Sequence, residues 1–288
     1  MPDHSNASPD SPATSSRFNL SVAELTEMAR QLRRHVITMT AAAGSGHPGG
    51  SLSAADIIAA LYFRVLRHDP ADPQWPDRDR FILSKGHAAP ILYAALAEAG
   101  YFPPSELATL RKLGSCLQGH ADMRLTPGVE MSSGSLGMGL SFAVGLALAA
   151  RMDSKAHRTY VMLSDGECQE GQTWEAALAA AHFKLDHLTA IVDYNGLQLS
   201  GRTRDIMNLD PFSQKWEAFG WHAIDIDGHD FDQILSACQA ALEMAGKSTV
   251  IIARTVKGKG VSFMESNVEF HGKAPTAEEA AKALKELA

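Results

Sequence analysis

The chain has 288 residues, with 26 Lys and Arg against 33 Asp and Glu, which gives it a formal net charge of −7. This mild acidity argues against the basic stripe of nucleic-acid-binding proteins, so no nucleic-acid partner is expected. Three cysteines, Cys116, Cys168 and Cys238, have no CxxC spacing. That disfavours both a disulfide framework and a cysteine zinc site, and it suits a reducing compartment.

The first 18 residues are rich in Ser, Pro, Asn and Asp and contain no apolar segment of the kind found in signal peptides. We expect residues 1–18 to form a disordered tail and residues 19–288 to form one domain. The longest apolar stretch, Gly139 to Ala150, is too short to cross a bilayer about 30 Å thick. These features predict a soluble, cytoplasmic protein that has no membrane partner.

Helical signals dominate the first part of the domain. Ser21 and Glu24 form a capping box, and the apolar periodicity that follows predicts a helix. This helix should end at the glycine-rich stretch Gly44–Gly50, which we expect to be a loop. A second helix is expected to begin near Ser53, and a short strand is predicted over Arg80–Leu83.

From residue 160 onward, strands and helices are predicted to alternate. The predicted strands are apolar runs at Tyr160–Leu163, Leu188–Val192, Trp221–Ile226 and Thr249–Ala253. The predicted helices are Glu170–Phe183, Phe212–Phe219, Phe231–Ala245 and, at the end, Thr276–Leu287. Strand–helix–strand repeats form right-handed crossovers, so the sequence predicts an α/β fold, a mostly parallel sheet with helices on both faces.

Two polar loops follow neighbouring strands of this predicted sheet. Asp165 comes after the strand at Tyr160–Leu163, and Asn195 follows the next strand, thirty residues later, which is the length of one βαβ unit. Ligands bind outside the carboxyl ends of such strands. A carboxylate, an amide oxygen and a free carbonyl suit Mg²⁺, which also takes phosphate oxygens. Gly166 would let the backbone approach that phosphate closely.

Asp165-Gly166 followed by Asn195 is the signature of thiamine-diphosphate enzymes. Over about residues 20–288 the chain resembles the N-terminal, diphosphate-binding part of transketolase. The motifs that occur in the family's order are Gly44–Gly49, Ser84–His87, Gln118–His120, Gly134–Gly137, Asp165–Gly171 and Phe270–Lys273. The resemblance implies the thiamine-diphosphate-binding fold, with thiamine diphosphate and Mg²⁺ as cofactors and Ca²⁺ or Mn²⁺ able to replace Mg²⁺.

The resemblance also assigns residues to the cofactor. Asp165, Asn195 and the carbonyl of Leu197 would hold Mg²⁺. The cofactor-binding residues that it implies are His87, Gly134, Ser135, Leu136, Asp165, Gly166, Glu167, Asn195, Leu197, Lys257 and His271. Taken alone, Glu167 is better explained as an acid at the positive end of the following helix. Taken alone, the Lys257 segment would be a solvated Lys/Gly turn.

Five residues are implied in catalysis. His47, His87, His120 and His271 would converge on the thiazolium and the sugar. Imidazoles titrate near neutrality, so they can remove and return protons and can hydrogen-bond sugar hydroxyls. Glu170 resembles the residue that meets the pyrimidine-activating glutamate across a subunit boundary.

The sequence departs from the family at two positions near this site. Ala121 follows His120 where many relatives have proline, and Met138 stands where glutamine is frequent. Neither position has to act chemically, so the expected activity is unchanged. The substrate contacts near His120 are the part that these departures put in doubt.

The implied activity is that of transketolase in the pentose phosphate pathway. A two-carbon ketol unit would pass from a ketose phosphate to an aldose phosphate by way of a dihydroxyethyl intermediate on thiamine diphosphate. Transketolases are usually more than twice this length, and the second domain binds the pyrimidine. We therefore expect this chain to be the N-terminal subunit of a split enzyme. Its partner would be a C-terminal transketolase subunit with the pyrimidine-binding domain, in an α2β2 assembly.

Other interpretations remain open. The chain could belong to a related thiamine-diphosphate enzyme: a 2-oxoacid dehydrogenase E1, a 1-deoxyxylulose-5-phosphate synthase, or a transketolase for an unusual sugar. A nucleotide-binding module is disfavoured because Gly246–Ser248 matches only the end of a P-loop. An inactive structural subunit is disfavoured because the metal-ligand and histidine positions are intact. The acidic segment Asp225–Asp230 could resemble a metal cluster but better fits a strand-to-helix turn capped by Asp230.

Overall fold

The computed structural model describes residues 18–288, so the predicted tail lies outside the described residues except for Phe18. The Phe18 ring packs with its centroid 5.5 Å from that of Phe63, so this residue belongs to the domain and not to a tail. The centre of the fold is a five-stranded, wholly parallel sheet in the order β1-β2-β3-β7-β6. The strands are β1 (Arg80–Leu83), β2 (Thr159–Ser164), β3 (Leu188–Tyr194), β7 (Thr249–Arg254) and β6 (His222–Asp227).

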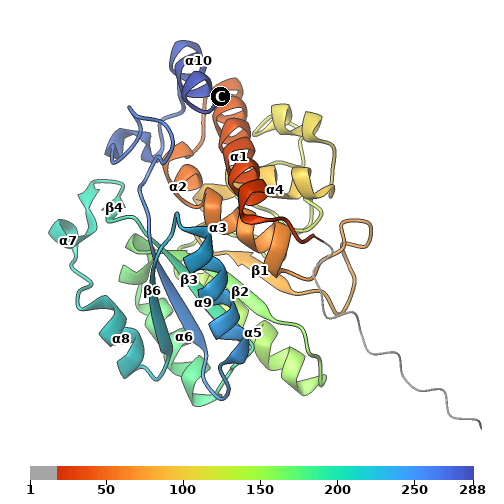
Figure 1. The fold of residues 1–288 in the computed structure, drawn as a ribbon, viewed down its shortest axis with the longest axis vertical. Coiled ribbons are helices and arrows are strands. Elements are labelled where there is room, and N and C mark those ends of the chain that lie inside the picture. Colours follow the sequence, from red (N-terminus) through yellow and green to blue (C-terminus); the bar gives the residue numbers. More distant parts are fainter. Residues whose placement is uncertain (1–17) are drawn as a thin grey trace, which may run out of the picture.

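Helices cover both faces of this sheet, as the α/β prediction requires. Tyr160 and Met162 of β2 pack into one buried cluster, whereas Val161 and Leu163 between and beside them pack into another. This alternation follows from the pleat of a strand. The first layer contains α1 (Val22–Ala43), α3 (Ala55–Ala60), α4 (Ala89–Ala99) and α9 (Phe231–Glu243); the second contains α5 (Met138–Met152), α6 (Gly171–His182) and α8 (Phe212–Ala218). Figure 1 shows the sheet between α9 and the more distant α5 and α6.

Short elements complete the fold. They are a π-helical turn (Leu61–Val65), 3₁₀ turns at Gly86–Ala88, Pro104–Thr109, Gly166–Gln169 and Val268–His271, the small helix α7 (Thr203–Ile206), the hairpin β4 (Leu197–Gln198) and β5 (Gly201–Arg202), and α10 (Ala277–Glu286). Capping boxes begin α1 at Ser21 and α10 at Thr276. The predicted strands and the later helices are confirmed to within about two residues.

The predicted loop Gly44–Gly50 is wrong in its second half. A helix, α2 (Pro48–Ser53), begins inside it, and proline at the first helical position has the φ that a helix start needs. Gly49 packs so closely that a Cβ there would lie 2.8 Å from the carbonyl oxygen of Phe270. These glycines therefore serve close packing of a buried helix, which sequence patterns do not distinguish from a loop.

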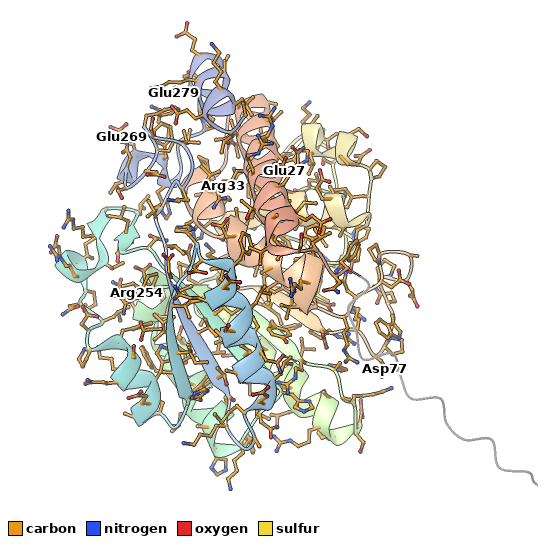
Figure 2. The ribbon with its side chains drawn as sticks, in the orientation of Figure 1. Glu27, Arg33, Asp77, Arg254, Glu269 and Glu279 are labelled. Carbon is orange, nitrogen blue, oxygen red and sulfur yellow. The ribbon has the colours of Figure 1, made fainter. Side chains whose placement is uncertain are left out.

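Many charged side chains lie at the surface, whereas a buried group of Arg33, Asp56 and His229 connects α1, α3 and the turn after β6. Figure 2 shows Glu269 and Glu279 at the outer edge of the molecule. Arg33 of α1 is only 7% exposed and donates to both carboxylate oxygens of Asp56, at 2.9 and 2.5 Å. Nδ1 of His229, in the turn after β6, lies 2.6 Å from the same carboxylate.

Two minor expectations are also decided by the fold. Asp230 caps α9 by accepting from the backbone N–H groups of Asp232 and Gln233, which confirms the strand-to-helix turn. Gly246–Ser248 precedes β7, whereas a P-loop follows a strand and opens a helix. Within residues 18–288, no helix is both long and apolar enough to span a bilayer.

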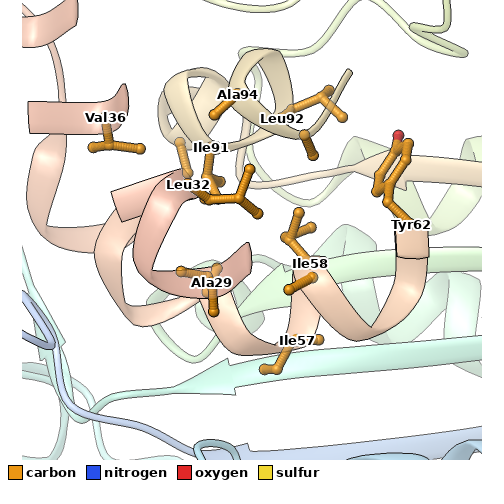
Figure 3. Packing of buried hydrophobic residues seen from close by; sticks show 14 of the residues in the cluster. Ala29, Leu32, Val36, Ile57, Ile58, Tyr62, Ile91, Leu92 and Ala94 are labelled. Carbon is orange, nitrogen blue, oxygen red and sulfur yellow. The ribbon is translucent and has the colours of Figure 1, made fainter. Parts of the chain in front are cut away.

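Ile58 of α3 lies in the first helical layer, where Figure 3 shows it near Leu32 of α1 and Leu92 of α4. Its side chain has no exposed surface. We expect Ile58→Ala to lower the free energy of unfolding by about 2–5 kcal/mol, because the substitution leaves a cavity among close-packed neighbours. Denaturant unfolding followed by circular dichroism measures the change.

The matched control is Leu113→Ala, because Leu113 is fully exposed. That substitution should change the free energy of unfolding by no more than about 0.5 kcal/mol. Equal losses in the two variants would contradict the packing described for α1, α3 and α4.

Candidate active site

A cavity of about 350 Å³ opens at the carboxyl edge of the sheet, the edge at which ligands bind in such folds. The sequence-predicted residues that line it are His87, His120, Gly134, Leu136, Gly166, Glu167, Glu170, Asn195, Leu197, Lys257 and His271. Three predicted residues are not in its lining: His47, Ser135 and Asp165. Of these, Ser135 is exposed to solvent and Asp165 is buried beside the lining residues Ser164 and Gly166.

Asp165 organises the turn that follows β3. The preceding residue, Ser164, pairs with Asp193 in the parallel register of β2 and β3. The two polar loops therefore emerge side by side, as predicted. The Asp165 carboxylate accepts from the backbone N–H of Gly166 at 2.9 Å and from that of Gly196 at 2.7 Å. The turn from Asn195 to Leu197 is therefore folded around a buried carboxylate.

The chemistry of these groups fits a divalent cation. Asp165 is 1% exposed, and burial together with the nearby Asp193 carboxylate raises its pKa to about 6. A bound cation would favour the ionised form. The Leu197 carbonyl already accepts from the Lys257 ammonium at 3.0 Å, so a cationic group contacts one of the three expected ligands.

No cluster of three or more His, Cys, Asp or Glu suited to a metal occurs within residues 18–288. The expected ligand set differs in kind, because it contains one carboxylate, one amide oxygen and one backbone carbonyl. Such a set suits Mg²⁺, which binds few protein carboxylates and completes its octahedron with water and phosphate oxygens. The residues present therefore fit the metal that the sequence resemblance implies.

Lys257 is a buried residue of this cavity and not part of a solvated turn. It is 2% exposed, and burial lowers its pKa to about 8. Its ammonium also donates to Nδ1 of His271 at 2.8 Å. Gly258 makes the local path possible, because its φ is +82° and a Cβ there would lie 2.2 Å from the carbonyl oxygen of Met264.

The four selected histidines lie together. The ring centroid of His47 is 5.4 Å from that of His87, 6.4 Å from that of His120 and 5.7 Å from that of His271. The rings of His87 and His271 stack with centroids 5.1 Å apart. These side chains come from four separate segments of the chain, so only the fold brings them into one cluster.

Burial and positive neighbours keep this cluster uncharged. Burial, Arg111 and His120 lower the pKa of His47 to about 4, and burial and Lys257 lower the pKa of His271 to about 4. The pKa values of His87 and His120 are lowered as well, in both cases first by burial. At neutral pH all four imidazoles are therefore uncharged.

The hydrogen bonds of Glu167 contradict its interpretation as an acid at the positive end of a helix. Its carboxylate, which has no exposed surface, accepts from the Ser84 hydroxyl, from the N–H of Gly137 at 2.9 Å and from the N–H of Ser164 at 3.2 Å. None of these donors belongs to the first turn of α6. Glu167 thus connects the ends of β1 and β2 to the glycine loop that lines the cavity.

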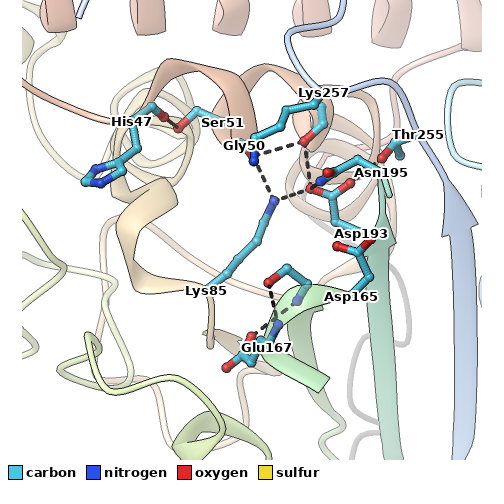
Figure 4. Close-up of polar contacts among 12 residues, drawn as sticks. His47, Gly50, Ser51, Lys85, Asp165, Glu167, Asp193, Asn195, Thr255 and Lys257 are labelled. Atoms are coloured by element: carbon cyan, nitrogen blue, oxygen red, sulfur yellow. Dashed lines mark hydrogen bonds and ion pairs between the residues drawn. The ribbon is translucent and has the colours of Figure 1, made fainter. Parts of the chain in front are cut away.

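Sequence reasoning missed the buried ion pair of Lys85 and Asp193. Lys85 donates to Asp193 at 2.5 Å and to the carbonyl of Gly50 at 2.7 Å, as Figure 4 shows. Asn195 also donates its amide N–H to the Asp193 carboxylate, at 3.2 Å, which turns its amide oxygen away from Asp193. Both charged residues come just after predicted buried strands. This shared position is the sequence feature that could have indicated a buried ion pair.

Glu170 is exposed at the rim of the cavity. It is the N-cap residue of α6, yet its side chain makes no capping hydrogen bond. Of the two departures from the family, Ala121 is 2% exposed and Met138 is 45% exposed. Ala121 therefore packs in the interior, while Met138 is open to solvent.

Comparisons with known proteins agree with this architecture. The family model described as transketolase, thiamine diphosphate binding domain, matches residues 25–288. The chain is 48% identical to the 6-deoxy-6-sulfo-D-fructose transketolase subunit SqwG of Clostridium sp. (strain MSTE9), over 92% of this chain and 96% of that one. It is 45% identical to one of the subunits of the apulose-4-phosphate transketolase of Actinobacillus succinogenes, over 94% of this chain and 98% of that one.

Longer transketolases match only in part. The transketolase of Homo sapiens is 44% identical over 86% of this chain, which corresponds to 40% of its own length. The crystal structure of transketolase from Campylobacter jejuni superposes with a TM-score of 0.88 at 34% identity, covering 93% of this chain and 43% of that one. The chain thus spans less than half of these transketolases. The match over residues 25–288 shows that the chain belongs to the family of transketolase thiamine diphosphate binding domains.

Proposed function

We propose that this chain is the thiamine-diphosphate-binding subunit of a two-chain transketolase, a transferase that moves a two-carbon ketol unit from a ketose phosphate to an aldose phosphate. The observation that carries the proposal is the pairing of a buried cation-demanding turn, built on Asp165, with a cluster of uncharged histidines at one cavity. The 96% and 98% coverage of relatives that are themselves named subunits supports the two-chain arrangement.

Asp165, Asn195 and the carbonyl of Leu197 would hold Mg²⁺, and Gly166 and Lys257 would face the diphosphate. Gly134, Ser135 and Leu136 would lie along the cofactor. Bound thiamine diphosphate supplies the nucleophilic carbon and accepts the electron pair of the broken C–C bond. The buried turn around Asp165 provides the negative charge that fixes the cation, and glycine allows the phosphate to approach the backbone.

The histidines would move protons of the sugar. Cleavage of a ketose requires removal of a hydroxyl proton, and addition to an aldose requires a proton for the new hydroxyl. A neutral imidazole can do the first and the resulting imidazolium the second. Because Lys257 and Arg111 disfavour charge on His47, a proton taken up there would be held weakly and returned readily.

The pyrimidine ring would bind elsewhere. Among the described residues that line the cavity there is no Phe, Tyr or Trp, so nothing there forms the aromatic pocket such a ring needs. We expect a C-terminal transketolase subunit to supply that pocket and the pyrimidine-activating glutamate, next to Glu170 at the exposed rim. An α2β2 assembly in the cytoplasm is the arrangement we propose.

Removing the metal ligands tests the cofactor site. We expect Asp165→Asn and Asn195→Ala each to weaken binding of thiamine diphosphate in Mg²⁺ buffer by roughly 100-fold or more, since changes even outside the ligand shell cost about 10–100-fold. Isothermal titration calorimetry on the chain with its partner measures the effect. Asp232→Asn, on the exposed first turn of α9, is the control and should bind normally; undiminished binding by both site variants would refute the site.

The two-chain arrangement predicts that the purified chain, supplied with thiamine diphosphate and Mg²⁺, transfers no ketol units. Activity should appear when a pyrimidine-binding subunit is added, because one chain lacks a binding pocket for half of the cofactor. A coupled spectrophotometric assay, with co-purification of a second polypeptide of similar size, checks this. Ketol transfer by the chain alone would overturn the proposal.

A transketolase for an unusual sugar is the second candidate, because the relatives at 48% and 45% identity are named for 6-deoxy-6-sulfo-D-fructose and apulose-4-phosphate. We expect the two-chain enzyme to accept ketoses and to leave 2-oxoacids unchanged, since four histidines suit a polyhydroxylated substrate. A panel of ketose phosphates, the sulfo-ketose, apulose-4-phosphate and 2-oxoacids distinguishes the candidates by kcat/KM. Preferential turnover of a 2-oxoacid would exclude both transketolase assignments.

A further inference from the structure

Arg111 adopts an unusual backbone conformation in the loop before His120. Its φ is +60°, in the left-handed region that costs a residue with a Cβ about 1–2 kcal/mol. Its backbone N–H donates to the carbonyl of Leu117 at 2.9 Å, which closes the loop. Glycine would adopt this backbone without strain, so the reason for an arginine at this position lies in its side chain.

The guanidinium of Arg111 connects the two loops that carry His47 and His120. One amino group donates to the hydroxyl of Ser45 at 2.9 Å, and the other donates to the carbonyl of Gly119 at 3.4 Å. Ser45 stands two residues before His47, and Gly119 stands directly before His120. The planar fork of arginine is suited to holding two acceptors in a fixed relation.

Gly119 allows this contact because it has no side chain. A Cβ at this position would lie 3.0 Å from Cζ of Arg111 and 3.2 Å from Nε. The guanidinium therefore packs directly on the backbone of the residue that precedes His120. The bridge is therefore a direct contact between the exposed Arg111 side chain and the backbone next to His120.

No carboxylate forms an ion pair with Arg111 within the part of the chain that the structure describes. Its charge therefore acts on the histidines. Arg111 lowers the pKa of both His47 and His120, second only to burial in each case. The other cationic or titratable groups that act on His47 are His120 and Lys257, and the rings of His87 and His271 pack against it.

We propose that Arg111 is a positioning residue of the proposed transketolase, holding the Ser45–His47 and Gly119–His120 loops together so that His120, which lines the cavity, and His47, which packs beside it, keep a fixed relation. The roles of the two histidines rest on the proposed function, whereas the bridge itself does not. The same guanidinium helps to keep both imidazoles uncharged and ready to accept a proton.

Arg111→Gly tests the bridge, and Lys184→Gly is its matched control. Lys184 also has a positive φ, of +50°, and it is exposed after the end of α6. Both substitutions place glycine where glycine is unstrained, so both proteins should fold with similar melting temperatures. Only Arg111→Gly should raise the pKa values of His47 and His120, measured by NMR titration of the imidazole carbons in the full-length chain.

In the reconstituted two-chain enzyme, Arg111→Gly should lower kcat by about 10- to 100-fold, as misplaced catalytic groups do, and leave the apparent affinity for Mg²⁺ and thiamine diphosphate unchanged. Arg111→Lys retains the charge but not the fork, so it should keep the histidine pKa values near those of the wild type and still lose kcat. Equal histidine titrations in the two glycine variants, or an unchanged kcat in Arg111→Gly, would overturn the proposal. The NMR comparison tests the action of Arg111 on the two histidines even if the wild type fails to transfer ketol units, an outcome that would refute only the proposed function.

Discussion

The site depends on two carboxylates buried side by side at the tips of neighbouring parallel strands. Asp193 is compensated within the chain, because the Lys85 ammonium contacts it at 2.5 Å. Asp165 accepts from two backbone N–H groups and from the Thr203 hydroxyl, and burial together with the Asp193 carboxylate raises its pKa. A buried carboxylate without a cation is unfavourable, and the proposed Mg²⁺ would supply at Asp165 the positive charge that Lys85 supplies at Asp193.

Around the histidines the electrostatic situation is reversed. Lys85, Lys257 and Arg111 are cationic groups near the histidines, and each contributes to lowering the pKa of at least one of them. The cavity therefore combines a carboxylate site suited to the proposed metal with histidines that resist protonation. Ketol transfer requires both properties, because the cofactor must be anchored while protons move between sugar oxygens and neutral bases.

The sequence predicted the parallel sheet, both helical layers and the adjacency of Asp165 and Asn195, because apolar runs and loop spacing encode these features locally. It did not predict α2, whose glycines are needed for packing against Phe270, a contact between segments more than 200 residues apart. The same reason hid the Lys85–Asp193 pair, the role of Glu167 and the Arg111 bridge. Each depends on which distant side chain lies opposite, and periodicity carries no information about that.

The exposed apolar rim of the cavity supports the proposed second chain. Leu136 and Leu199, which line the cavity, are 37% and 68% exposed, and Met138, which follows closely after Leu136 in sequence, is 45% exposed. Apolar side chains at the mouth of a site that must exclude water are unfavourable unless something covers them. A pyrimidine-binding subunit seated on this rim would bury these side chains, bring an acidic group to Glu170 and shield the histidines from bulk water. In the proposed enzyme, this chain would bind the diphosphate and position the histidines, and the partner would cover the cavity in which they act.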